Sequence, residues 1–211
     1  MKKIYFILVL FYVGMAAQNN FRLPDSLSTK SYSYFNEKIR YKVKDSTIEK
    51  IHAHSWLAKA KFEKNHNQMT MAYKALIYKF DKEISLKYAD SSIAAAIKTA
   101  NSELIGSAYM IKGALLFDNK EMMNALDNYL IAEVHISEIE NEYLSYKLKY
   151  CIALTKYYLG HYQEAIDLFK ECITYFKEEN DHAYLKSLYS LGQCYTRTNK
   201  TPLDSQTNEV D

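Results

Sequence analysis

The sequence predicts an all-α protein built as a solenoid of antiparallel helical hairpins, and two observations carry that prediction. No proline occurs in the 177 residues between Pro24 and Pro202, and this stretch is rich in Ala, Leu, Lys, Glu and Tyr, which favour helix. A spaced pattern of small and bulky apolar residues also recurs along the chain. Its best copy comprises Leu159, Gly160, Tyr162, Ala165, Phe169 and Cys172. Recurrence over a period longer than one helix is typical of repeats that bury their apolar faces against one another.

Turn-forming residues divide the proline-free stretch into about eight helices. Asp45-Ser46 with Glu49 has the form of a capping box, and Asn101 and Asn141 stand at further corners. The expected helices span residues 46–64, 68–80, 84–100, 103–118, 121–140, 143–159, 162–178 and 182–198. Their short links favour antiparallel neighbours.

The first residues have the pattern of a secretory signal peptide. Lys2 and Lys3 precede an almost wholly apolar run from Ile4 to Met15, and the small residues Ala16-Ala17 follow. Spanning a bilayer needs about 20 apolar residues, so the run is short for a permanent membrane helix. We therefore expect cleavage after Ala17, export to the periplasm or secretion, and no stable membrane span after cleavage.

The chain is expected to divide into four parts. These are a signal peptide at 1–17, a partly helical segment at 18–44, a helical repeat domain at 45–200 and a polar, disordered tail at 201–211. The 194 residues that remain after cleavage suffice to bury a core as one domain.

The spaced residues resemble the tetratricopeptide repeat (TPR) family. That family places a small residue in a first helix and a glycine at the turn, followed by Tyr, Ala, a bulky aromatic and a small residue in a second helix. The best copy supplies Ala153, Gly160, Tyr162, Ala165, Phe169 and Cys172. The copy before it supplies Gly113, Lys120 in place of glycine, Met122, Ala125, Tyr129 and Ala132. The resemblance implies a right-handed solenoid and a non-catalytic scaffold that binds proteins or peptides.

The outer copies are weaker, and the spacing is wide. The earliest copy comprises Ile77, Ile84 at the turn, Leu86, Ala89, Ile93 and Ala96. The last, partial copy comprises Leu191, Gly192 and Tyr195. Successive alanines at 89, 125 and 165 lie 36 and 40 residues apart, against about 34 for the family.

The layout also resembles the exported N-terminal TPR region of bacterial membrane-bound regulators with an AraC-type helix-turn-helix domain. This resemblance implies an alternative function, the sensing half of a membrane-bound transcriptional regulator, without a DNA-binding domain in this chain. The expected helix 182–198 is apolar over most of its surface, yet polar residues follow it. We therefore expect either a truncated or frameshifted relative of a longer protein or a surface that self-associates.

Charge and motifs argue against nucleic-acid binding and catalysis. Loss of Lys2 and Lys3 from the 27 Lys and Arg leaves 25, which balance 25 Asp and Glu, whereas nucleic-acid binders carry a basic excess. No phosphate loop, nucleophile elbow or HExxH motif occurs. His52 and His54 are two residues apart on a helix and so cannot share a metal, and His135 with Glu138 has no second such pair. We predict no enzymatic activity, no cofactor and no metal.

The odd number of cysteines and the absence of a CxxC motif argue against a zinc site or a disulfide framework. Cys172 holds the small-residue position of its repeat, which indicates a buried apolar side chain. The sequence leaves open whether Cys151 and Cys194 of neighbouring repeats form a disulfide bridge.

In TPR arrays the first helices line a groove, and the resemblance implies a binding site for an unidentified protein or peptide there. The groove residues would be Lys74, Tyr78, Met110, Phe117, Lys147, Tyr150, Leu154, Tyr157, Tyr158, Lys186, Tyr189, Gln193 and Arg197. Aromatic residues interleaved with Lys and Arg suit a peptide with acidic and apolar groups. The alternative is that tyrosines at this spacing pack between repeats. Tyr78 and Leu154 stand where a carboxylate-clamp TPR would need Asn, so recognition of a C-terminal carboxylate is not expected.

Overall fold

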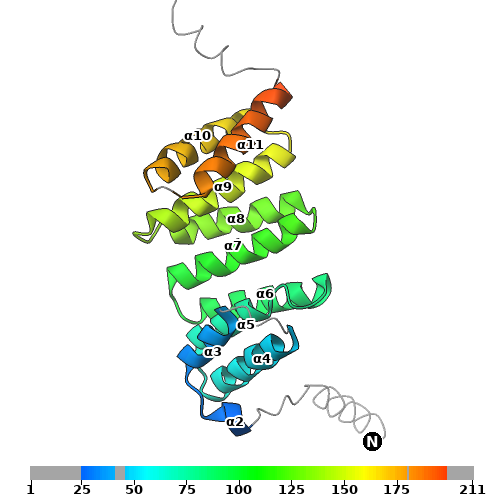
Figure 1. The fold of residues 1–211 in the computed structure, drawn as a ribbon, viewed down its shortest axis with the longest axis vertical. Helices are drawn as coiled ribbons and strands as arrows, with labels where there is room; N and C mark the ends of the chain where they lie inside the picture. Colours follow the sequence, from blue (N-terminus) through cyan, green and yellow to red (C-terminus); the bar gives the residue numbers. More distant parts are fainter. Residues whose placement is uncertain (1–24, 41–45, 180, 199–211) are drawn as a thin grey trace, which may run out of the picture. The chain divides into compact units, whose positions relative to one another are not determined.

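The computed structural model describes residues 25–40, 46–179 and 181–198, and the chain divides into two compact units, residues 1–65 and 66–211. Regular structure in the described ranges is helical throughout, with no strand among them (Figure 1). The expected signal peptide and the expected tail at 201–211 lie outside the described residues.

The first unit is a small helical cluster. It contains α2 (Asp25–Ser28), α3 (Tyr32–Arg40) and α4 (Ser46–Phe62), and α4 packs against both of the others. Phe35 of α3 and Trp56 of α4 are buried. The Tyr32 hydroxyl donates to a Glu63 carboxylate oxygen at 2.5 Å and ties α3 to the end of α4 at the surface.

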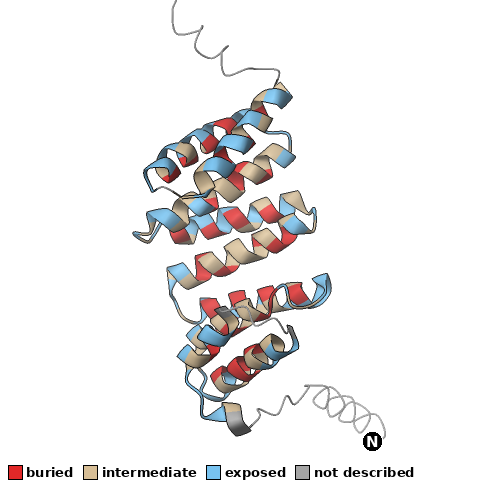
Figure 2. Ribbon diagram, viewed as in Figure 1, coloured by how far each residue is buried: buried red, intermediate tan, exposed pale blue. Residues whose placement is uncertain are grey.

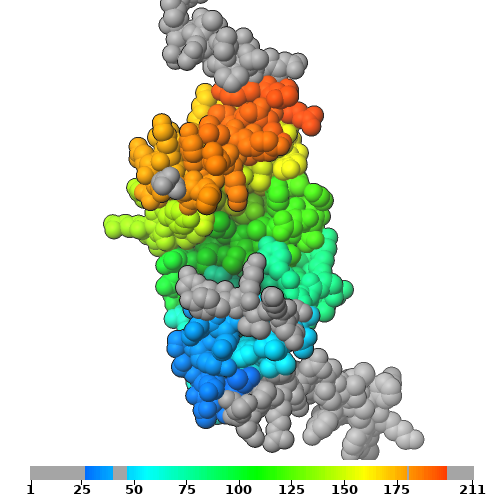
Figure 3. Space-filling view, in the orientation of Figure 1, coloured from blue at the N-terminus to red at the C-terminus, as the bar shows by residue number. Residues whose placement is uncertain are grey.

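The second unit is a succession of antiparallel helical hairpins. Its helices are α5 (His66–Leu76), α6 (Lys82–Ile97), α7 (Ser102–Asp118), α8 (Met122–Ile136), α9 (Glu142–Tyr158), α10 (Tyr162–Glu178) and α11 (Ala183–Thr198). Each helix packs against the next one in the chain, and the space-filling view shows α7 to α11 following one another in close contact (Figure 3). These helices correspond to the expected ones, with α5 and α8 ending four residues earlier than the sequence indicates.

Side chains at the corners decide where the helices begin. The side-chain oxygens of Asp81, Asn101 and Asn141 accept hydrogen bonds from backbone N–H groups three residues on, at 3.0, 2.9 and 3.0 Å. These are N-caps, which satisfy donors that the first helical turn leaves free. They confirm the helix starts expected at Asn101 and Asn141.

The turn expected at Ile84 is wrong. Because Asp81 caps α6, Ile84 lies inside that helix, and the left-handed residue of the turn is Tyr78, with φ 66°. Lys120 and Gly160 take the same conformation in the next two hairpins, with φ 66° and 86°. The link between α5 and α6 is longer than the links of the next two hairpins, so the left-handed residue lies six positions before Ile84.

Buried residues recur along every helix of the second unit (Figure 2), and they include alanines and aromatic residues of the repeat pattern. Ala125, Tyr129 and Ala132 of α8 are buried in one cluster with residues of α7 and α9. Ala165 and Phe169 of α10 are buried in a second cluster with Ala153 of α9. Burial of the apolar pattern between successive helices is the packing that the recurring small and bulky residues predicted.

Glycines on α7 permit its close approach to α8. A Cβ at Gly113 would lie 2.6 Å from the Tyr129 ring, and one at Gly106 would lie 2.6 Å from Ile136 Cγ1. Real side-chain carbons do not come so close, so the two helices pack as they do only because these positions lack a side chain.

No helix in the described ranges has the length and apolar character needed to cross a membrane.

Candidate binding face of the first helices

The first helix of each hairpin, α5, α7, α9 and α11, contributes to one face of the second unit. Besides their contacts with chain neighbours, α5 contacts α7, α7 contacts α9, and α9 contacts α11. The second helices α6, α8 and α10 have at most marginal backbone contact with each other. The first helices are therefore the more closely spaced set, and we call the surface that they form the first-helix face.

The sequence-predicted groove residues are distributed over all four of these helices. They are Lys74 on α5 and Tyr78 in the turn after it; Met110 and Phe117 on α7; Lys147, Tyr150, Leu154, Tyr157 and Tyr158 on α9; and Lys186, Tyr189, Gln193 and Arg197 on α11.

Four of these residues form a continuous line across α7, α9 and α11. Phe117 meets the Tyr158 ring edge-on, with centroids 5.4 Å apart. Tyr158 meets Tyr157 at 5.3 Å between ring centroids, and Tyr157 is close enough to Arg197 of α11 to raise the pKa of its guanidinium. We call Phe117, Tyr158, Tyr157 and Arg197 the aromatic line. Tyr158 is 56% exposed, so the line offers ring surface to solvent.

The aromatic line ends in a permanent positive charge. The nearby Tyr157 and, to a smaller extent, Tyr162 raise the pKa of Arg197 further above its usual value. Two more cations lie on the same helices: exposed Lys186 on α11, and exposed Lys147, whose Nζ lies 4.5 Å from the Tyr143 ring centroid. This end of the first-helix face therefore combines aromatic rings with positive charge, which suits ligands that carry apolar and acidic groups.

A polar cluster lies where the turn after α5 approaches α7 and α9. Tyr78 is 55% exposed, yet the burial of its hydroxyl, with Asp118 and Cys151 nearby, raises the pKa of Tyr78 to about 12. The Cys151 thiol lies near the buried Tyr129, and burial together with this thiol raises the pKa of Tyr129. Burial raises the pKa of Cys151 to about 11 against the smaller opposing effects of Tyr129 and Lys147. The thiol is therefore protonated at neutral pH, which makes it a poor nucleophile.

Other predicted groove residues serve the packing between helices. The Tyr150 ring meets the buried Phe169 ring edge-on, with centroids 5.7 Å apart. Met110 and Leu154 are half-buried against the core clusters. Lys74 donates to Ser107 Oγ at 3.0 Å, and burial lowers its pKa despite the opposing charge of Glu103. For these four residues, interhelical packing is the role that the contacts describe.

The sequence reasoning missed Tyr143 and Asp181. The Tyr143 hydroxyl donates to Asp181 Oδ2 at 2.7 Å, and its ring lies under Lys147. The hydrogen bonds that Asp181 accepts, chiefly from the Ala183 N–H, together with the charge of Lys147, hold the pKa of the Asp181 carboxyl below its usual value. The four-residue spacing of Tyr143 and Lys147 was the available sequence signal, because such residues are neighbours on a helix.

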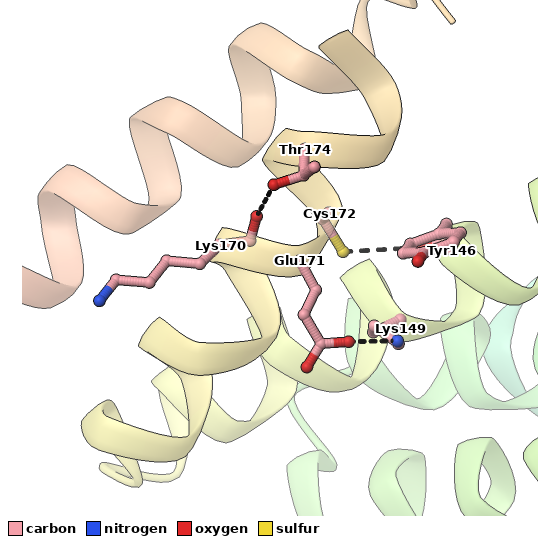
Figure 4. A network of polar contacts seen from close by, with 6 residues as sticks. All are labelled: Tyr146, Lys149, Lys170, Glu171, Cys172 and Thr174. Atoms are coloured by element: carbon pink, nitrogen blue, oxygen red, sulfur yellow. Dashed lines mark hydrogen bonds and ion pairs between the residues drawn. The ribbon is translucent and has the colours of Figure 1, made fainter. Parts of the chain in front are cut away.

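The opposite side of α9 is occupied by α10. Tyr146 stacks on Tyr175 with ring centroids 4.0 Å apart. Figure 4 shows Lys149, whose Nζ donates to Glu171 Oε2 at 2.5 Å. Cys172 is fully buried, and its thiol donates to the Tyr146 carbonyl oxygen at 3.7 Å. The expectation of a small buried side chain at Cys172 is confirmed.

The cysteines are unpaired, and the described ranges hold no cluster of three or more His, Cys, Asp or Glu placed to bind a metal ion. The Cys151–Cys194 bridge that the sequence left open is therefore not formed.

Comparison with solved structures shows a TPR-like fold. A putative kinesin light chain from Podosopora anserina with nearly identical TPR-like repeats is similar with a TM-score of 0.62 and 11% identity, over 84% of this chain and 90% of that one. A substituted form of that protein has a TM-score of 0.63 and 11% identity, over 84% of this chain and 89% of that one. A Rap protein complexed with Competence and Sporulation Factor has a TM-score of 0.60 and 20% identity, over 83% of this chain and 50% of that one. No protein-family model and no curated protein matches the chain. The likenesses confirm the predicted all-α, TPR-like solenoid.

Proposed function

We propose that the second unit is a non-catalytic scaffold that binds a segment of a partner protein or a peptide on its first-helix face. The aromatic line carries this proposal, because it joins α7, α9 and α11, leaves Tyr158 56% exposed and ends at Arg197, next to Tyr157. Aromatic residues and arginine are enriched where protein interfaces hold their binding energy. The Rap protein of similar fold, which was solved with a bound factor, is in keeping with this role.

The expected ligand is an extended or helical peptide with both apolar and acidic side chains. Apolar groups would contact Tyr158 and Phe117, and carboxylates would meet Arg197, Lys147 or Lys186. Arginine binds carboxylates with two parallel hydrogen bonds, which selects acidic ligands over neutral ones.

A peptide library displayed on phage, selected against the purified chain, tests the proposal. Selected peptides are expected to be enriched in acidic and apolar residues and to bind Tyr158→Ala and Arg197→Ala at least about tenfold more weakly, as loss of an interface anchor does. Met123→Ala is the matched control, because Met123 is 61% exposed on the second helix α8. Binding that is equally strong in all three variants would place the ligand elsewhere.

We also propose that the chain works outside the cytoplasm. Support comes from the basic start, the apolar run and Ala16-Ala17. Mass spectrometry of the protein recovered from the periplasm or medium should find Gln18 as the first residue. Recovery only from the cytoplasm, with Met1 or Lys2 first, would contradict export.

The second candidate function is signal sensing for a membrane-bound transcriptional regulator. The observation in its favour is the exposed apolar surface of α11, which offers a neighbouring domain a contact adjacent to the aromatic line. Translation of the downstream DNA in three frames is the test. Absence of a membrane helix and a helix-turn-helix there would remove this candidate.

A further inference from the structure

Tyr146 of α9 and Tyr175 of α10 form a parallel ring stack. Their ring centroids lie 4.0 Å apart, and their planes are inclined by 7°. At this separation the carbon atoms of one ring lie over the other ring at about van der Waals distance. Both side chains are half-buried, so small solutes can reach them. Two phenol rings from different helices are therefore held with their π faces against each other.

Two other pairs of tyrosines meet with a different geometry. Tyr157 and Tyr158 are inclined by 78°, with centroids 5.3 Å apart, and Tyr157 and Tyr162 are inclined by 57°, with centroids 5.6 Å apart. The ring planes in these pairs are steeply inclined, so their π faces do not oppose each other. The stack of Tyr146 and Tyr175 differs from them in the respect that decides whether ring carbons can form a bond.

Neighbouring side chains fix the two stacked rings. The buried Phe176 ring meets Tyr146 and Tyr175 edge-on, with centroids 6.4 and 5.4 Å away. Lys149 Nζ lies 4.7 Å from the centroid of the Tyr146 ring and is paired with the Glu171 carboxylate (Figure 4). Because Glu171 offsets the positive charge, Lys149 adds little to the cost of removing an electron from Tyr146.

The phenol of Tyr175 has proton acceptors nearby. Burial and the carboxylates of Glu179 and Glu142 raise the pKa of Tyr175, so its phenol is protonated at neutral pH. Removal of an electron from a phenol makes its proton strongly acidic, and these exposed carboxylates can accept the proton and release it to water. One-electron oxidation of Tyr175 therefore yields a neutral phenoxyl radical.

Two phenoxyl radicals in contact combine without a further reactant. The unpaired electron of each radical is shared between the oxygen and the ring carbons ortho and para to it, and in tyrosine the para carbon already carries the Cβ. Pairing of the two electrons forms a carbon–carbon bond between one ortho carbon of each ring. Each of these carbons then loses its hydrogen as a proton, and each oxygen gains a proton, which restores both phenols. The net change is the loss of two electrons and two protons.

We propose that Tyr146 and Tyr175 are a site of oxidative cross-linking, at which a one-electron oxidant joins their ortho carbons as a dityrosine and links α9 covalently to α10. Two equivalents of the oxidant take up the two electrons. The orbitals that form the bond stand perpendicular to the ring planes, so a parallel stack already directs them at each other, and the step takes place within one chain. The cross-link involves no residue of the aromatic line, and it stands whether or not the first-helix face binds a peptide.

Oxidation of the purified full chain by photogenerated tris(bipyridyl)ruthenium(III), with persulfate as the final electron acceptor, tests the proposal. The monomeric product should show dityrosine fluorescence and a mass lower by two hydrogen atoms. Its yield per chain should stay constant when the protein is diluted, because both rings belong to one chain. Tandem mass spectrometry of tryptic peptides should place the link at Tyr175 and at Tyr146, and not at Tyr143, which lies in the same tryptic peptide as Tyr146.

Phenylalanine variants identify the two rings. Tyr146→Phe and Tyr175→Phe each remove the phenol that forms the radical and keep a ring of the same shape in the stack. Each should lower the yield of dityrosine within the chain by at least about tenfold, because the preorganised pair is lost. Tyr158→Phe is the matched control, since Tyr158 also contacts a tyrosine ring but at 78°, and it should leave the yield unchanged. Far-UV circular dichroism compares the folding of the variants.

The stability of the product gives a second readout. The purified cross-linked chain should unfold at a higher urea concentration than the unmodified chain, because a covalent link between residues 146 and 175 constrains the unfolded state. Dityrosine that persists in Tyr175→Phe, a link at Tyr143 or at tyrosines outside the stack, or a yield that rises with protein concentration would each overturn the proposal. Oxidation that modifies the chain without a 146–175 product would also overturn it.

Discussion

Replacement of Gly113 by alanine should destabilise the protein, although alanine is the better helix former. The new Cβ would lie 2.6 Å from Tyr129 Cε1 and 2.7 Å from Cδ1. Carbon atoms pack best at about 3.5–4.0 Å, so the ring or α8 must move by roughly 1 Å. Tyr129 is 2% exposed in a cluster of buried residues from α7, α8 and α9, so the ring has little room to move.

The net effect follows from two opposing terms. Overpacking a core costs about 1–3 kcal/mol, whereas the higher helix propensity of alanine contributes at most about 1 kcal/mol in favour of folding. We expect the free energy of unfolding to fall by about 1–2 kcal/mol. Gly192→Ala is the matched control, because Gly192 holds the same repeat position but faces open space. That variant should gain up to about 1 kcal/mol.

Urea denaturation followed by circular dichroism measures both changes, at a protein concentration low enough to keep the chain monomeric. Tyr129→Leu in the same chain should reduce the cost of Gly113→Ala, since the smaller side chain leaves space for the new methyl group. Equal changes in stability for Gly113→Ala and Gly192→Ala would refute the close approach of α7 and α8 at Gly113.

Further predictions concern the turns, the titration and the thiols. Lys120→Gly should stabilise the protein by about 1 kcal/mol and Gly160→Ala should destabilise it by a similar amount, because both positions have a left-handed φ that suits glycine; the urea midpoints of the two variants should shift in opposite directions. The Cys151 pKa is raised from 9.0 to about 11 in the folded chain, so the unfolded chain binds fewer protons between these values and stability should fall from about pH 9 to pH 11. Urea midpoints measured across this range should decline less in Cys151→Ala, and an identical decline in both proteins would count against the buried thiol. The three thiols should react with a disulfide reagent slowly at pH 8 and rapidly in urea, and fast reaction of buried Cys172 in the folded protein would contradict its burial.

Much of the helical architecture could be predicted from local sequence. The absence of proline between Pro24 and Pro202, the caps at Asn101 and Asn141 and the recurring alanines act over a few residues or one helix face, so they can be recognised without knowledge of the fold. The turn expected at Ile84 is wrong, because the spacing between turn and alanine in the later repeats does not hold for the first hairpin. The local cap at Asp81 was the better guide.

The groove residues were expected from the resemblance to TPR arrays, and their role in binding stays a prediction. Phe117, Tyr157, Tyr158 and Arg197 lie on the first helices, and contacts between their side chains link α7, α9 and α11. The structure also gives Lys74 and Tyr150 packing partners that no spacing indicated, because those partners, Ser107 and Phe169, belong to other helices.

The sequence by itself determined that the chain is helical, where most helices begin, and which residues form the apolar repeat pattern. Only the tertiary structure decided which tyrosines are buried and which are available to a partner. Tyr129 is buried because Gly113 on a different helix makes room for its ring, whereas Tyr189, which has a glycine three positions away on its own helix, is 70% exposed. Burial depends on the size and distance of side chains on neighbouring helices, and the periodicity of one helix carries no information about them.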